Sequence, residues 1–179
     1  MNPVALLPRP VSLARVDRNG ETHEVAATED ERARIKEALE LLDLPRLAAG
    51  VTLARSGSTK ITVTGQIDAE LVQACVVTLE PVTQRIEQVF ERRFVPSGEA
   101  AGSAAPSAID VAPEGEDPPD VYEADRIDIG AVVMEELILA IDPYPRAPGA
   151  ELPEEATDDA DEAPESPFAA LKTLGHGRR

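Results

Sequence analysis

Cys75 is the only cysteine of the chain, and it lies in a run of strand-forming residues that ends at Glu80-Pro81. A nucleophilic or redox thiol needs a nearby base and a lowered pKa. No histidine accompanies this run, in which Val76, Val77 and Leu79 are the neighbours of the thiol. Free cysteine is among the most frequently buried residue types. We therefore expect Cys75 to be a buried residue of a strand, and a thiol or redox enzyme is the least favoured function.

A second candidate for chemistry is the adjacent carboxylate pair Glu135-Glu136. Neighbouring residues of a helix point about 100° apart, so the two carboxylates do not face one another as an acid and a base would. Glu136 lies nearer the apolar stripe of its helix and could pair with an arginine of the sheet. The chain has no Gly-rich phosphate loop, serine nucleophile elbow or His-Glu-x-x-His motif. The sequence predicts a structural or partner-facing role for this pair, and no enzyme.

The concentrated positive charge consists of Arg85, Arg92 and Arg93. On a regular strand Arg85 and Arg93 share one face, and Arg92 points to the other. Contact with RNA phosphates is one interpretation, but Glu87 and Glu91 accompany the arginines and no aromatic residue shares the exposed strand face for base stacking. A solvated strand face is favoured, and a basic surface that meets a protein partner is as reasonable as direct RNA contact.

The formal net charge is −17, and its distribution along the chain is uneven. Residues 1–96 carry 14 acids and 12 bases, whereas the rest of the chain carries 20 acids and 5 bases. A single cysteine excludes an intramolecular disulfide and a cysteine-rich zinc site, so no cofactor is expected. The sequence shows neither a signal peptide nor an apolar run of membrane-spanning length, which predicts a cytoplasmic protein without membrane or small-molecule partners.

The periodicity predicts an α+β fold with an antiparallel sheet of five or six strands and two main helices packed on it. Thr28 and Glu31 form a capping box for the first helix, which Pro45 should end near Asp43. Asp128 is the expected N-cap of a second, largely apolar helix that continues to about Ile141. Alternation and turn residues place strands at 11–16, 51–55, 60–67, 71–79 and 85–95.

The domain organisation follows from composition. We expect a single domain over residues 1–150, with a flexible acidic insertion at 97–125. Residues 151–179 are predicted to be a flexible acidic tail, because 151–165 contain eight acids and no base. Phe168 and Leu171 form a short apolar motif near its end. In an adaptor function, this tail would present Phe168 and Leu171 to a basic partner such as a ribosomal protein.

Two segments together resemble a known family. The first is Cys75 with Leu79-Glu80-Pro81, and the second combines Asp128-Ile129-Gly130, Glu135-Glu136 and Asp142-Pro143-Tyr144-Pro145-Arg146. In this order they resemble the YceD family of bacterial and plastid proteins, and the form found here looks like its alphaproteobacterial branch. The resemblance implies a non-enzymatic cytosolic factor that supports accumulation, processing or assembly of large-subunit (23S-type) ribosomal RNA.

The chain departs from the family pattern at its cysteines. Many similar proteins carry two cysteines in the first segment and another pair near the C-terminus, which suggests a metal site. Here the second position holds Thr78 or Val77, and no later cysteine exists. The resemblance therefore implies no zinc ligands for this chain.

Overall fold

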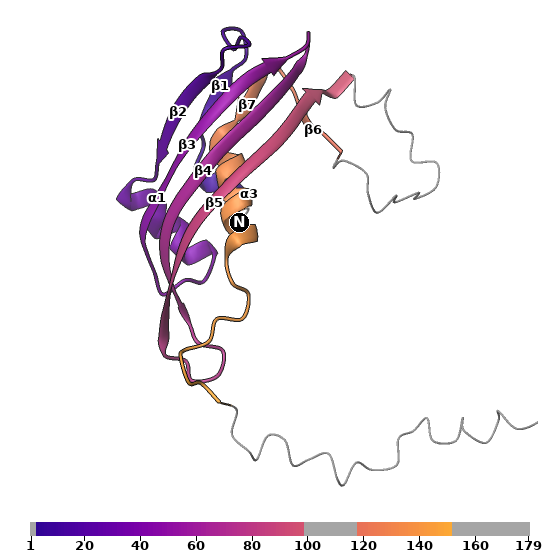
Figure 1. Cartoon of the computed structure of the whole chain (residues 1–179). Coiled ribbons are helices and arrows are strands. Elements are labelled where there is room, and N and C mark those ends of the chain that lie inside the picture. Colours follow the sequence, from indigo (N-terminus) through magenta and orange to yellow (C-terminus); the bar gives the residue numbers. More distant parts are fainter. Residues whose placement is uncertain (1–2, 99–117, 152–179) are drawn as a thin grey trace, which may run out of the picture.

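The computed structural model describes residues 3–98 and 118–151, which form a bent sheet with helices against one of its faces (Figure 1). The helices are α1 (Glu29–Ala38) and α3 (Ile129–Ala140), preceded by a short 3-10 helix, η1 (Pro3–Leu6). The sheet has the order β2 (Glu21–Ala26), β3 (Asp43–Ser56), β4 (Lys60–Ala74), β5 (Pro81–Pro96) and β6 (Asp120–Tyr122). A separate two-stranded sheet pairs β1 (Pro10–Ser12) with β7 (Arg126–Asp128). The predicted α+β fold is confirmed.

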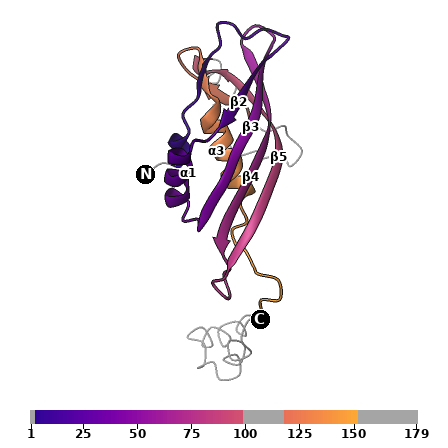
Figure 2. The same cartoon turned by 90° about the vertical axis from the view of Figure 1, so that its left-hand side faces the viewer.

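Strict alternation along the central strands builds the core. The helices cover one face of the sheet (Figure 2). Val51, Leu53, Ile61 and Val63 are fully buried on this face, and the alternation along β3 and β4 places the intervening residues on the open face. Met134 and Leu137 of α3 complete this core, together with Ile35 of α1. Burial of each such aliphatic side chain contributes about 1.5–3 kcal/mol. The open face of the sheet has no helix against it in the described part of the chain.

Gly65 of β4 lies directly opposite Phe90 of β5, and the Phe90 ring crosses the backbone at that point. A Cβ atom at position 65 would be 2.5 Å from Cζ of Phe90. Glycine is therefore needed here for a close approach of a side chain to the strand.

The first helix begins as predicted and ends earlier than predicted. Both halves of the capping box are present, because Thr28 Oγ1 accepts from the Glu31 amide while Glu31 Oε2 accepts from the Thr28 amide. The helix ends at Ala38, and Glu40 follows with a left-handed φ of 54°. Pro45 therefore does not end this helix: it lies within β3 at a bulge, where the ladder tolerates a missing N–H.

Several strands differ from the predicted ranges. Strand β2 was not predicted, and β3 and β4 are each one long strand of 14 and 15 residues, respectively. The predicted strand 71–79 is wrong at its end, since β4 stops at Ala74. Strand β6 runs parallel to β5, whereas the other neighbours in this sheet are antiparallel. The second helix is largely apolar, as predicted, but its Leu139 is 78% exposed.

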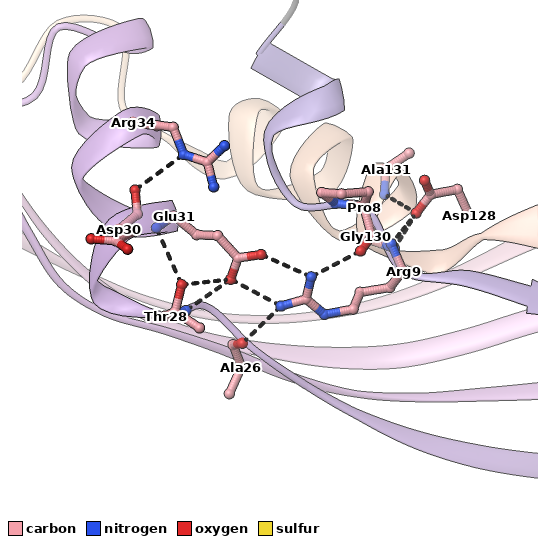
Figure 3. Close-up of polar contacts among 10 residues, drawn as sticks. All are labelled: Pro8, Arg9, Ala26, Thr28, Asp30, Glu31, Arg34, Asp128, Gly130 and Ala131. Carbon is pink, nitrogen blue, oxygen red and sulfur yellow. Dashed lines mark hydrogen bonds and ion pairs between the residues drawn. The ribbon is translucent and has the colours of Figure 1, made fainter.

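Arg9 fastens the N-terminal segment to α1 (Figure 3). Its guanidinium donates to both carboxylate oxygens of Glu31, each at 2.9 Å, and to the carbonyl oxygen of Ala26 at 3.2 Å. The Arg9 hydrogen bonds, helped by those from Thr28, lower the pKa of Glu31 to about 2. Glu31 is thus the N3 residue of the capping box and half of a largely buried ion pair.

Asp128 and Gly130 fasten the same segment to α3. Asp128 Oδ1 accepts from the Arg9 amide at 2.8 Å and from the amides of Gly130 and Ala131, so this carboxylate caps the helix as predicted. Gly130 packs directly under the Leu7 carbonyl group, and a Cβ there would overlap that oxygen. The Asp-Ile-Gly sequence therefore has a structural role at the helix start.

Residues 99–117 and 152–179 lie outside the described residues, and with them most of the predicted insertion and tail, including Phe168 and Leu171. Within the described ranges, neither helix is both long and apolar enough to cross a bilayer.

Candidate functional site

The first family-like segment and the end of the second meet at the end of the β4–β5 hairpin, although the 60 residues 81–140 lie between them in the sequence. One is the connection formed by residues 75–80, here called the Cys75 turn. The other is the segment that follows α3, residues 141–151, here called the C-terminal segment. The Val76 amide donates to the Pro145 carbonyl oxygen at 2.9 Å, and the Ala147 amide donates to Cys75 Sγ at 3.3 Å. Backbone hydrogen bonds thus join the two segments into one site.

Two glutamines of the hairpin also hold the C-terminal segment. Gln73 Nε2 donates to the Asp142 carbonyl oxygen at 3.1 Å. Gln84 receives the Asp142 amide at 3.1 Å and donates to the Ala140 carbonyl oxygen at 3.0 Å. These glutamines were not predicted as site residues. A signal was present, because both occupy positions of β4 and β5 whose alternation points toward the helices.

The Cys75 turn is closed by its own backbone. The Cys75 amide donates to the Glu80 carbonyl oxygen at 2.8 Å, and the Leu79 amide donates to the Cys75 carbonyl oxygen at 3.0 Å. Leu79 adopts a left-handed φ of 62°, which is uncommon for a residue with a branched side chain. Pro81 is the first residue of β5, a position where the missing N–H of proline is tolerated.

The Cys75 sulfur is surrounded by hydrogen-bond donors. Besides the Ala147 amide, the amides of Val77 and Thr78 each lie 3.4 Å from Sγ. The Thr78 side chain and these backbone amides lower the pKa of the Cys75 thiol to about 6. The predicted burial is confirmed, since Cys75 is 0% exposed, but its predicted place in a strand is wrong because it lies in the turn after β4.

This arrangement stabilises a thiolate and at the same time encloses it. A nucleophile must reach its substrate, and the donors around Sγ are supplied by the segments that cover it. Neither does the turn suit a metal ion: within residues 3–98 and 118–151 no three cysteine, histidine or carboxylate groups are arranged so that they could hold one. Thr78, a candidate for the second cysteine position, supplies a hydrogen bond to Sγ instead. The Cys75 sulfur acts here as a hydrogen-bond acceptor that holds the C-terminal segment in place.

Arg92 and the two helix carboxylates lie together on the helix-covered face of the sheet. The Arg92 guanidinium donates to Asp120 at 2.7 Å, to Glu136 at 3.1 Å and to Glu135 at 3.3 Å. Burial alone would lower the pKa of Arg92, but the hydrogen bonds to Asp120 and Glu136 raise it. Glu136 thus pairs with a sheet arginine, and the cluster joins β5, β6 and α3.

Arg85 and Arg93 lie on the open face of the sheet, as their spacing predicts. Arg85 is 81% exposed and pairs with Glu70 at 3.2 Å. Alternation places five carboxylates and four basic side chains on this face: Glu24, Asp68, Glu70, Glu87 and Glu91, with Arg46, Lys60, Arg85 and Arg93. The face is therefore close to neutral and mixed in sign.

A comparison with protein families shows to which family the chain belongs. The family model described as "Large ribosomal RNA subunit accumulation protein YceD" matches residues 63–175. The chain belongs to the YceD family. The match covers β5, α3 and both segments of the site. It therefore includes the residues whose hydrogen bonds join the Cys75 turn to the C-terminal segment. No curated protein and no solved structure matches the chain.

Proposed function

We propose that this YceD-family chain is a non-enzymatic cytosolic factor that supports accumulation of large-subunit ribosomal RNA by binding a basic protein partner. The description of the family supports the link to ribosomal RNA. The alphaproteobacterial form of the signature, with one cysteine and Asp142-Pro143-Tyr144-Pro145-Arg146, supports membership of that branch.

One observation supports binding to a protein in preference to RNA: the arginines that were candidates for RNA contact form ion pairs with carboxylates of the chain itself. Arg92 is held by three carboxylates on the helix-covered face of the sheet, and Arg85 is held by one carboxylate on the nearly neutral open face. Phosphate binding needs a local excess of positive charge, because its free energy comes largely from counterion release. The open sheet face offers no such excess, so direct RNA binding by this face is the weaker account.

Charge favours a basic partner. Residues 152–165, which follow the described C-terminal segment, carry seven acids and no base. Such a sequence repels phosphate within about a Debye length, ~8 Å at physiological salt, and attracts cationic proteins. Ribosomal proteins are one class with this charge.

The test compares two variants in cells that lack the wild-type chain. Deletion of residues 152–179 should lower large-subunit ribosomal RNA, whereas the double charge reversal Arg85→Glu/Arg93→Glu should have the smaller effect. Both variants are first matched for expression and melting temperature. A silent deletion together with loss of the RNA in the double reversal would overturn the proposal in favour of direct RNA binding by the open sheet face.

A further inference from the structure

Three large apolar side chains are exposed where the two segments of the site meet. Leu79 is 75% exposed, Tyr144 73% and Val76 48%. Val76 and Leu79 belong to the Cys75 turn, and Tyr144 precedes Pro145, whose carbonyl oxygen accepts from the Val76 amide. These three residues are here called the Leu79 patch. Single exposed apolar residues are common, but several on one small, projecting site mark an interaction surface.

The backbone under the Leu79 patch is fixed rather than loose. Leu79 is held in its left-handed conformation by the hydrogen bonds that close the turn, and Tyr144 lies in an Asx turn, with its amide donating to Asp142 Oδ1 at 2.9 Å. The Cys75 sulfur and Gln73 tie the C-terminal segment to the hairpin. A surface that is ordered before binding loses less conformational entropy on association. Leu79 is exposed and adopts a backbone conformation that glycine adopts more readily, which costs free energy locally. Folding alone does not explain why a leucine occupies this position.

The charges beside the Leu79 patch determine the kind of partner. The two segments carry Glu80, Asp142 and Glu151 against the single base Arg146. The described residues end at Glu151, four residues after Ala147, whose amide donates to Cys75 Sγ, and seven further acids follow in residues 152–165. An apolar patch with an acidic surround complements a protein surface that combines an apolar pocket with lysine and arginine.

We propose that the Leu79 patch is the docking surface for this basic protein partner, with Leu79 and Tyr144 as the side chains that enter its apolar pocket. The inference rests on the proposed function and adds the surface that performs it. The acidic residues after Glu151 strengthen the encounter, while the patch supplies the apolar contact.

The experiment measures binding of the full-length chain to large-subunit ribosomal proteins that have been freed of RNA with nuclease. Leu79→Gly removes the side chain at a position whose φ suits glycine, and should weaken binding at least about tenfold with little change in melting temperature. Tyr144→Ser should act in the same direction. Leu139→Ala is the matched control, since Leu139 is 78% exposed on α3 outside the patch, and should bind as the wild type does.

Other outcomes contradict the inference in distinguishable ways. If both patch variants bind normally while deletion of 152–179 abolishes binding, the patch is not the docking surface, although the proposed function stands. If the wild-type chain binds none of the RNA-free proteins, both proposals fail. A Leu79-dependent loss of RNA affinity in place of protein affinity, or a Leu79-dependent dimer in sedimentation, would assign the patch to RNA or to a second copy and overturn the inference.

Discussion

Glu31 offers the sharpest test of how the N-terminal segment is held. Its carboxylate accepts two hydrogen bonds from Arg9 and closes the capping box of α1, and only 11% of its side chain is exposed. Glu31→Gln removes the charge and keeps a side chain that can still cap the helix. The substitution therefore isolates the charge of Glu31.

The magnitude follows from the pKa of Glu31, which falls from the ordinary 4.5 to about 2 on folding. Each pKa unit corresponds to about 1.4 kcal/mol, so the carboxylate stabilises the fold by at most about 3 kcal/mol. Arg9 is 30% exposed, and solvent screening reduces this to on the order of 2 kcal/mol. Because the pKa is depressed in the folded state, this contribution is complete above pH 4.5 and is lost as the pH falls toward 2.

Urea denaturation of the wild type and of Glu31→Gln between pH 2.5 and 7 measures this contribution. The difference in unfolding free energy should be about 2 kcal/mol at pH 7 and should shrink steadily below pH 4.5. Glu29→Gln, at an exposed glutamate of the same helical turn, should change the free energy by only a few tenths of a kcal/mol. A Glu31→Gln difference that is the same at pH 3 and pH 7, or no larger than that of Glu29→Gln, would refute the reasoning.

Two further predictions concern packing. Gly130→Ala should lower the unfolding free energy by at least about 3 kcal/mol, because the new methyl group overlaps the Leu7 carbonyl oxygen and the N-terminal segment must move off α3. An unchanged melting temperature would show that Gly130 and the Leu7 carbonyl group pack less closely than described. Cys75→Ala should cost on the order of 1 kcal/mol and leave large-subunit ribosomal RNA near its normal level, since the sulfur is a buried acceptor. Loss of the RNA in a variant with an unchanged melting temperature would give Cys75 a chemical role.

Features encoded by a few neighbouring residues could be predicted from the sequence, and features made by distant residues could not. The capping box of Thr28 and the N-cap of Asp128 are local hydrogen bonds, and both occur as predicted. Strand β2 was missed because Glu-Thr-His-Glu has the composition of a loop; its place at the sheet edge leaves most of these side chains partly or fully exposed.

In the site, too, the features set by neighbouring residues could be predicted, and those made by distant residues could not. The burial of Cys75 follows from its residue type, but its enclosure depends on the amide of Ala147, 72 residues away. The pairing of Glu136 with a sheet arginine was anticipated from its place on the helix, whereas the third carboxylate on Arg92 comes from Asp120 of the short parallel strand β6. Neither the Ala147 contact nor the pairing of β6 leaves a signal in sequence spacing.

The central claim is that this YceD-family chain acts on large-subunit ribosomal RNA through a basic protein. The most direct measurement is affinity purification of the tagged full-length chain from cells, with and without RNase treatment of the extract. The account predicts that a basic protein remains bound after RNase treatment and that no ribosomal RNA fragment is protected. Loss of all bound protein after RNase treatment, together with retention of a protected large-subunit RNA fragment, would contradict it.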